Sequence, residues 1–147
     1  MAAPTYDELK ALEFDYLTGA DLLRFCPFQV LQKQLAIDDD SVQIGCDIAY
    51  SEMLSTLGAR YDIATELTKT GTARYSLAIK IAAILAVRNI VGNQSGLPQN
   101  MLDNFTWVDK TILNIRNGQE SLAGLNISPD AHISKTELIP GSFTTLG

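Results

Sequence analysis

Histidine is the side chain most often used for proton transfer and zinc binding, and this sequence contains one, His132 near its C-terminal end. A Ser-His-Asp triad or a multi-histidine metal site would need further partners that the chain does not supply. A lone histidine in a segment that contains Pro and Gly is typical of an incidental residue. We therefore predict that the protein is not an enzyme and has no catalytic, cofactor-binding or metal-binding residues.

The acidic run Asp38-Asp39-Asp40 resembles a calcium loop in charge alone, because it lacks the central glycine and the distal glutamate of such a loop. It stands directly before the apolar-periodic segment that begins at Ser41. Carboxylates there offer acceptors and negative charge to the first N–H groups of a helix. The run therefore predicts a helix start. The glycines of residues 92–96 follow a predicted helix and not a strand, so they indicate no nucleotide-binding loop.

The two cysteines, Cys26 and Cys46, form neither a Cys-x-x-Cys pair nor the framework of a disulfide-rich secreted domain, and we expect both to be reduced. Residues 1–12 carry no basic region ahead of an apolar run, so we expect no signal peptide. We also expect no membrane partner, because charged residues interrupt the most apolar segment.

The net charge of −6 is unevenly distributed along the chain. Residues 1–52 hold ten acids and three bases, whereas residues 53–119 hold seven bases and four acids. Direct DNA binding is disfavoured, because its affinity usually comes from Lys and Arg displacing counterions at phosphates. The asymmetry indicates either a solvated acidic face or a self-complementary assembly surface.

Apolar periodicity and capping signals predict a mainly α fold, a small helical bundle with extended N- and C-terminal arms. We expect one domain over residues 16–125, an acidic N-terminal extension over residues 1–15 and a C-terminal arm over residues 126–147 that becomes ordered on a partner. Residues 65–72 are polar and are predicted to form a loop. Four of the predicted helices cover residues 5–12, 18–25, 41–57 and 73–91. Two more begin at Phe28 and Met101 and end before Asp38 and Gly118, respectively.

The predicted helix over residues 73–91 is apolar on nearly every side. Charged residues interrupt it too often for a membrane span, so it must be covered by protein. Two arrangements would cover it. Either it lies at the centre of its own bundle, or a neighbouring subunit covers the part that its own chain leaves exposed.

Arg74 and Arg88 fall on one stripe of this predicted helix. Because an unpaired buried charge is costly, each guanidinium must extend to solvent, pair with a carboxylate of its own chain or pair with one on a neighbouring copy. Trp107 lies off the apolar stripe of the last helix. There it makes either a second core contact or the anchor of a protein contact.

A series of short motifs resembles the head-to-tail adaptor, or connector, proteins of tailed bacteriophages, particularly the Mu-like group. The resemblance covers roughly residues 16–125, and its most specific piece is the Gly-x-Arg-Tyr-x-Ile pattern at the end of the predicted helix over residues 41–57. In chain order the motifs are Tyr16-Leu17-Thr18, Asp21-Leu22-Leu23-Arg24-Phe25, the turn at Asp38 to Asp40, Leu57-Gly58-Ala59-Arg60-Tyr61-Asp62-Ile63 and Ile115-Arg116-Asn117-Gly118.

The resemblance implies a structural virion protein that forms a homo-oligomeric ring, commonly a dodecamer. The ring would sit in the neck below the portal protein and above a stopper or tail protein, after assembly in the host cytoplasm. DNA would pass through its lumen without specific binding, which an acidic protein favours. The C-terminal arm would reach neighbouring copies or the next ring.

The subunit-interface candidates are Arg60, Tyr61, Arg74, Arg88 and Trp107. We expect the basic middle of one copy to meet acids from residues 1–52 of the next copy, since a head-to-tail ring repeats one contact between two different patches. Two alternative functions remain: a tail-terminator or stopper ring protein, and a small helical regulatory or binding module. The latter lacks the basic recognition helix that DNA reading requires.

Overall fold

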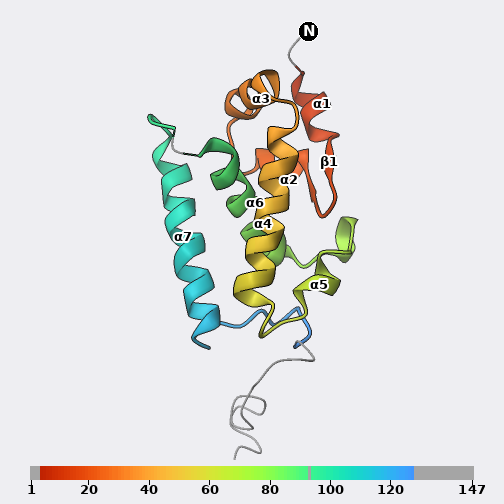
Figure 1. Cartoon of the computed structure of the whole chain (residues 1–147), viewed down its shortest axis with the longest axis vertical. Coiled ribbons are helices and arrows are strands. Elements are labelled where there is room, and N and C mark those ends of the chain that lie inside the picture. Colours follow the sequence, from red (N-terminus) through yellow and green to blue (C-terminus); the bar gives the residue numbers. More distant parts are fainter. Residues whose placement is uncertain (1–3, 93, 128–147) are drawn as a thin grey trace, which may run out of the picture.

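The computed structural model describes residues 4–92 and 94–127, which form a helical bundle elongated along one axis (Figure 1). The predicted mainly α fold is confirmed. The long helices are α4 (Ser41–Leu57), α6 (Ser76–Val91) and α7 (Gln99–Arg116). The shorter elements are α1 (Tyr6–Lys10), β1 (Glu13–Phe14), β2 (Leu17–Thr18), α2 (Gly19–Leu23), α3 (Phe28–Ile37), α5 (Ile63–Glu66) and the 3-10 helix η1 (Gly71–Ala73).

Two capping boxes organise the N-terminal part of the bundle. Thr5 and Glu8 pair at the start of α1, where the side chain of each accepts a hydrogen bond from the backbone N–H of the other. Thr18 and Asp21 pair in the same way at the start of α2. Each pair satisfies N–H groups that the first turn of a helix leaves without partners. Between the two helices, β1 and β2 form an antiparallel hairpin whose turn holds Asp15 at a positive φ of 67°. Aspartate tolerates this left-handed conformation better than most residues.

Helix α1 lies directly on the start of α2. The Gly19 N–H donates to the carbonyl of Leu12 at 2.8 Å, and Leu9 is fully buried. A Cβ at position 19 would lie 1.6 Å from the Leu9 carbonyl oxygen, so only glycine fits this approach. Residues 4–15, expected as part of an acidic extension, are therefore packed on the bundle.

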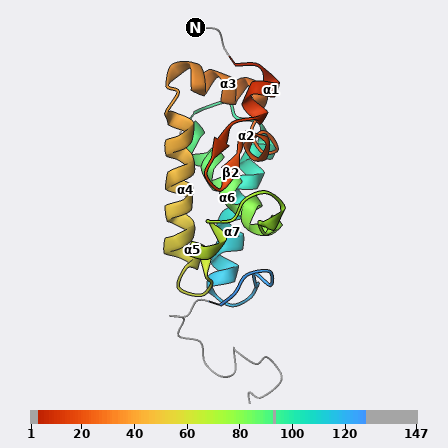
Figure 2. The ribbon, with the colours of Figure 1, turned by 90° about the vertical axis from the view of Figure 1, so that its right-hand side faces the viewer.

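Helix α4 has the bounds that the sequence predicts, from Ser41 to Leu57 with Gly58 after it. Its inward stripe is buried, as expected, and comprises Val42, Gly45, Cys46, Ala49, Met53 and Leu57. Both cysteines are free and buried, which agrees with the expected reduced state. Helix α4 runs along one side of the molecule, and Figure 2 shows it at the left edge of the ribbon.

Helix α6 occupies the centre of the bundle, where ten of its sixteen residues are buried. Helix α4 packs along it, and α2, α3 and α7 cover its other sides. A Cβ at Gly45 would lie 2.6 Å from Cγ1 of Ile90, so this glycine sets the close approach of α4 to α6. Of the two arrangements open from the sequence, the structure shows burial by the chain itself. Within the described part of the chain, no helix is long and apolar enough to cross a membrane.

The segment between α4 and α6 differs from the prediction. The polar stretch 65–72 was expected to be a loop, but its start belongs to α5 and its end to η1. Asp62 caps α5 by accepting from the Thr65 N–H at 3.3 Å. Helix α6 begins at Ser76, three residues later than expected, and Arg74 lies before it in extended backbone. Arg74 and Arg88 therefore do not share a helical stripe.

The chain after α7 turns back beneath the end of α4, as Figure 1 shows in blue. The Asp62 N–H donates to the carbonyl of Asn126 at 2.8 Å, and Tyr61 forms an antiparallel bridge with Ile127. The first two residues of the expected C-terminal arm are thus attached to the bundle. The remainder, residues 128–147, lies outside the described residues.

Candidate functional site

A buried hydrogen-bond network connects three separate parts of the chain around Glu66. The Tyr16 hydroxyl donates to Oε2 of Glu66 at 2.6 Å, and the Tyr75 N–H donates to the same oxygen at 2.7 Å. Oε1 lies 3.2 Å from Nζ of Lys69, although the pair lacks hydrogen-bond alignment. Tyr16 and Glu66 are each 1% exposed. A substrate could not reach them in this fold, so we assign the network a structural role.

The pKa of the Tyr16 phenol is shifted above its usual range, first by burial and then by the hydrogen bond to Glu66. The phenol therefore stays protonated and remains a hydrogen-bond donor. Its ring packs edge-to-face with Tyr50, whose hydroxyl donates to the Phe14 carbonyl and accepts from the Leu17 N–H at 3.0 Å. Both tyrosines thus attach the hairpin to the bundle.

Arg74 closes the other end of the same network. Its guanidinium donates to Oδ2 of Asp21 at 2.6 Å and to the Tyr16 carbonyl at 2.8 Å. The two side chains are 11% and 10% exposed. An acid from residues 1–52 and a base from residues 53–119 therefore meet within one copy. Arg74 has an intrachain partner and is not available as an interface cation.

Arg88 also pairs inside its own chain. It donates to Asp109 on α7 at 2.6 Å and lies 3.7 Å from Glu52 on α4. Asn89 donates to the other oxygen of Glu52 at 2.6 Å. These contacts join the three long helices. Of the three expectations for Arg88, the structure again shows the intrachain partner.

The Gly-x-Arg-Tyr-x-Ile motif holds the end of the described chain. Tyr61 is buried, and its hydroxyl accepts the Leu122 N–H at 3.1 Å. Arg60 donates to the Arg116 carbonyl at 3.4 Å. Tyr61, one of the predicted interface residues, is therefore part of the core. Within the described residues, the motif holds the segment 117–127 beneath the end of α4 through these contacts.

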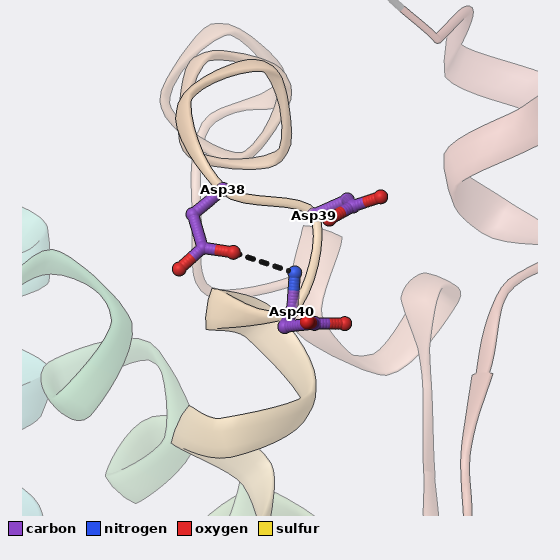
Figure 3. Close-up of side chains that lie close together, drawn as sticks. All are labelled: Asp38, Asp39 and Asp40. Carbon is purple, nitrogen blue, oxygen red and sulfur yellow. Dashed lines mark hydrogen bonds between the residues drawn. The ribbon is translucent and has the colours of Figure 1, made fainter.

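The acidic run between α3 and α4 forms a compact turn, shown in Figure 3. Oδ1 of Asp38 accepts the Asp40 N–H at 3.0 Å, and the Ser41 hydroxyl donates to the Asp38 carbonyl at 2.7 Å. One carboxylate oxygen from each aspartate lies within 4.8 Å of the others, and all three residues are exposed. Asp40 occupies the N-cap position but makes no side-chain cap bond. The acidic run precedes the start of α4 as predicted. Its side-chain hydrogen bond comes from Asp38 and stabilises the turn before the helix, instead of capping the helix itself.

The solvent-facing side of α4 carries exposed apolar side chains, which the sequence analysis did not predict. We call this surface the outer α4 face. It consists of Ile44, Ile48, Ser51 and Ser55, which line a shallow depression bordered by Asp47 and Glu52. At about 100° per residue these four uncharged side chains lie opposite the buried stripe. Ile44 and Ile48 are 51% and 45% exposed. Ile44 and Ile48 stand one helical turn apart, so α4 places two adjacent apolar side chains at the surface.

A second surface feature lies on α6 and α7, and we call it the basic patch. Nζ of Lys80 stands over the indole ring of Trp107, 4.0 Å from its centroid, and Lys110 lies exposed one turn further along α7. Trp107 is half-buried. Its predicted second core contact is therefore partial, and one part of the indole remains accessible beside Lys80.

No family model, curated protein or solved structure matches the chain. The function must therefore be argued from the residues and their arrangement.

Sequence reasoning identified one member of these two surfaces, Trp107. It missed the outer α4 face, although the signal was present: Ile44 and Ile48 are spaced by four and fall outside the predicted apolar stripe. It missed Lys80 and Lys110, because isolated lysines on predicted helices carry no signal that distinguishes them from other solvent-exposed charges. Of the predicted interface residues, Arg74 and Arg88 are ion-paired within the chain and Tyr61 is in the core.

Proposed function

We propose that this protein is a structural subunit of a tailed-phage virion, a head-to-tail adaptor that forms a homo-oligomeric ring in the neck. The ring would dock below the portal protein and above a stopper or tail protein, and DNA would pass through its lumen without specific binding. The motifs of residues 16–125 support this assignment. The observation that carries it is the outer α4 face.

The outer α4 face favours a role in assembly for a physical reason. Bundle helices usually direct charged and polar side chains to solvent, whereas α4 places Ile44 and Ile48 there. The fold does not need these two side chains, because α6 is already covered by its own chain. Covering them with another protein would remove apolar area from water at roughly 25 cal/mol per Å².

The charges of the molecule fit the same role. The chain carries a net charge of −6. Two of the arginines between residues 53 and 119, Arg74 and Arg88, form ion pairs with carboxylates of the same chain. A ring of such subunits would present little positive charge to DNA phosphates, so DNA could slide past without being retained.

Ring formation is the test of this proposal. Native mass spectrometry and negative-stain electron microscopy of the purified chain, alone and mixed with the portal protein of the same virus, should show one closed ring with a central channel. A chain that stays monomeric at every concentration and does not bind the portal would contradict the proposal.

A further inference from the structure

We propose that the outer α4 face of one copy binds the basic patch of the next copy, so that this single contact repeats around the ring. The inference rests on the proposed function, since it names the surfaces through which the ring would assemble. The outer α4 face is Ile44, Ile48, Ser51 and Ser55, and the basic patch is Lys80, Trp107 and Lys110.

The two surfaces face different directions, as a head-to-tail contact requires. On α7, Asp109 and Leu113 line the groove next to α4. Trp107 is displaced from Asp109 by about 160° around the helix, so it lies on the flank turned away from α4. Two different patches on different sides of one subunit generate rings when the rotation closes, whereas a patch that binds itself gives a two-fold dimer.

The charges around the outer α4 face favour a second copy of this chain as its binding partner. Asp47 is exposed beside the outer α4 face, and Asp15 lies near it, bridged through the amide of Gln43. Glu52, on the other border, is already matched by Arg88. The free charge along the face is therefore negative.

On the opposing surface, Lys80 and Lys110 supply two positive charges. The nearby Asp103 contributes one negative charge and accepts from Gln99 at 2.9 Å. The patch is thus net positive and complements the border of the outer α4 face. Opposite charges of this kind orient two copies and exclude the reversed pairing, in which acid would meet acid.

The apolar parts complement each other as well. The outer α4 face presents two branched side chains next to two small serines, which leaves room for a flat ring to lie in the depression. Trp107 offers such a ring, partly buried and therefore already restricted in its conformations. Half-buried tryptophans surrounded by polar side chains are typical anchors of protein contacts.

Disulfide trapping tests the pairing directly in the full chain. Cys26 and Cys46 are buried, and burial raises the pKa of each thiol to about 12, so neither native thiol should react under mild oxidation. Ile48→Cys protein mixed with Lys110→Cys protein should give a covalent heterodimer. A chain carrying both substitutions should give a ladder of covalent oligomers. Leu54→Cys combined with Lys110→Cys is the matched control, because Leu54 lies on α4 about 120° away from Ile48.

The outcomes separate this inference from the proposed function. A heterodimer together with the ladder supports the pairing. Disulfides between two Ile48→Cys chains, or rings that form without the heterodimer, would overturn the pairing and leave the ring itself standing. Absence of both rings and cross-links at every concentration would overturn both proposals.

Charge reversal gives an independent readout. Asp47→Lys or Lys110→Glu alone should weaken association, on the order of tenfold, and the two together should restore most of it. Equal loss in the double variant would show that these two side chains do not meet.

Discussion

The guanidinium of Arg74 and the carboxylate of Asp21 lie 2.6 Å apart, although 53 positions separate them in the chain. This pair joins the start of α2 to the segment before α6, and the Tyr16 carbonyl accepts from the same guanidinium. The acidic first part and the basic middle of the sequence therefore complement each other inside one copy. The proposed contact between copies therefore involves other charged residues, Asp47, Lys80 and Lys110.

Asp21→Asn should destabilise the fold by about 3 kcal/mol, because it leaves the nearly buried Arg74 guanidinium without its counter-charge. Asp109→Asn is the matched control. Asp109 also lies 2.6 Å from its arginine, but its side chain is 66% exposed, so its loss should cost no more than about 1 kcal/mol. Urea denaturation followed by circular dichroism measures both. Equal costs for the two variants would contradict the structural role of the Arg74 pair.

Tyr16→Phe should cost about 2 kcal/mol, since the buried Glu66 loses a charge-assisted hydrogen bond and water cannot replace it. Tyr6→Phe removes a hydroxyl from a half-exposed ring and should change the free energy of unfolding by less than about 0.5 kcal/mol. Thermal unfolding of the two variants against the wild type compares them. If Tyr16→Phe behaves like Tyr6→Phe, Glu66 is not held as the structure shows.

Stability should fall as the pH rises from about 9 toward 12. Burial raises the pKa of the Cys26 and Cys46 thiols to about 12, so the folded state keeps protons that the unfolded state releases from about pH 9 upward. Below that range both states are protonated and the thiols contribute no pH dependence. Within it, each thiol lowers the free energy of unfolding by up to about 1.4 kcal/mol per pH unit.

The double variant Cys26→Ala/Cys46→Ala provides the control for this slope. Tyr16 and Tyr50 also have pKa values raised by burial, so part of the alkaline loss should remain. The measurement is the urea midpoint from pH 8 to 11. An unchanged slope in the double variant would show that the thiols are accessible to solvent in the folded protein.

Gly19→Ala should cost about 3 kcal/mol or more, because its Cβ would collide with the Leu9 carbonyl oxygen and force α1 away from α2. Gly45→Ala should cost less, since its closest contact is Cγ1 of Ile90, a side-chain atom, and alanine favours the helix by about 1 kcal/mol. Chemical denaturation would rank the two. The reverse order would contradict the packing of α1 described above.

Local patterns in the sequence predicted most of the helices well. Helix α4 was predicted with its observed bounds because an apolar stripe, an acidic start and a terminal glycine all agree there. The two capping boxes likewise marked α1 and α2. The loop predicted over residues 65–72 is wrong at its two ends, which belong to α5 and η1, and the polar composition concealed the buried Glu66.

The partners of the polar residues could not be predicted in the same way. The Tyr16 hydroxyl and Glu66 are 50 positions apart, and only the folded chain brings them together. Helix α6 is apolar on nearly every side, which correctly indicated that protein covers it. Periodicity alone cannot tell whether the same chain or another copy covers a helix. The candidate contact surfaces were found only after the structure had assigned Arg74 and Arg88 to partners of their own chain.

The central claim, that this chain is an assembly subunit and that the outer α4 face mediates its assembly, is tested most directly by one mass measurement. Ile48 and Leu54 lie on the same helix with nearly equal exposure, 45% and 44%, but only Ile48 belongs to the outer α4 face. The wild type, Ile48→Asp and Leu54→Asp should be compared by mass photometry over a concentration series, with the portal protein present and absent. We predict rings for the wild type and Leu54→Asp, and folded monomers with unchanged helicity for Ile48→Asp. Rings that form equally well with Ile48→Asp, or a wild type that never assembles, would contradict the account.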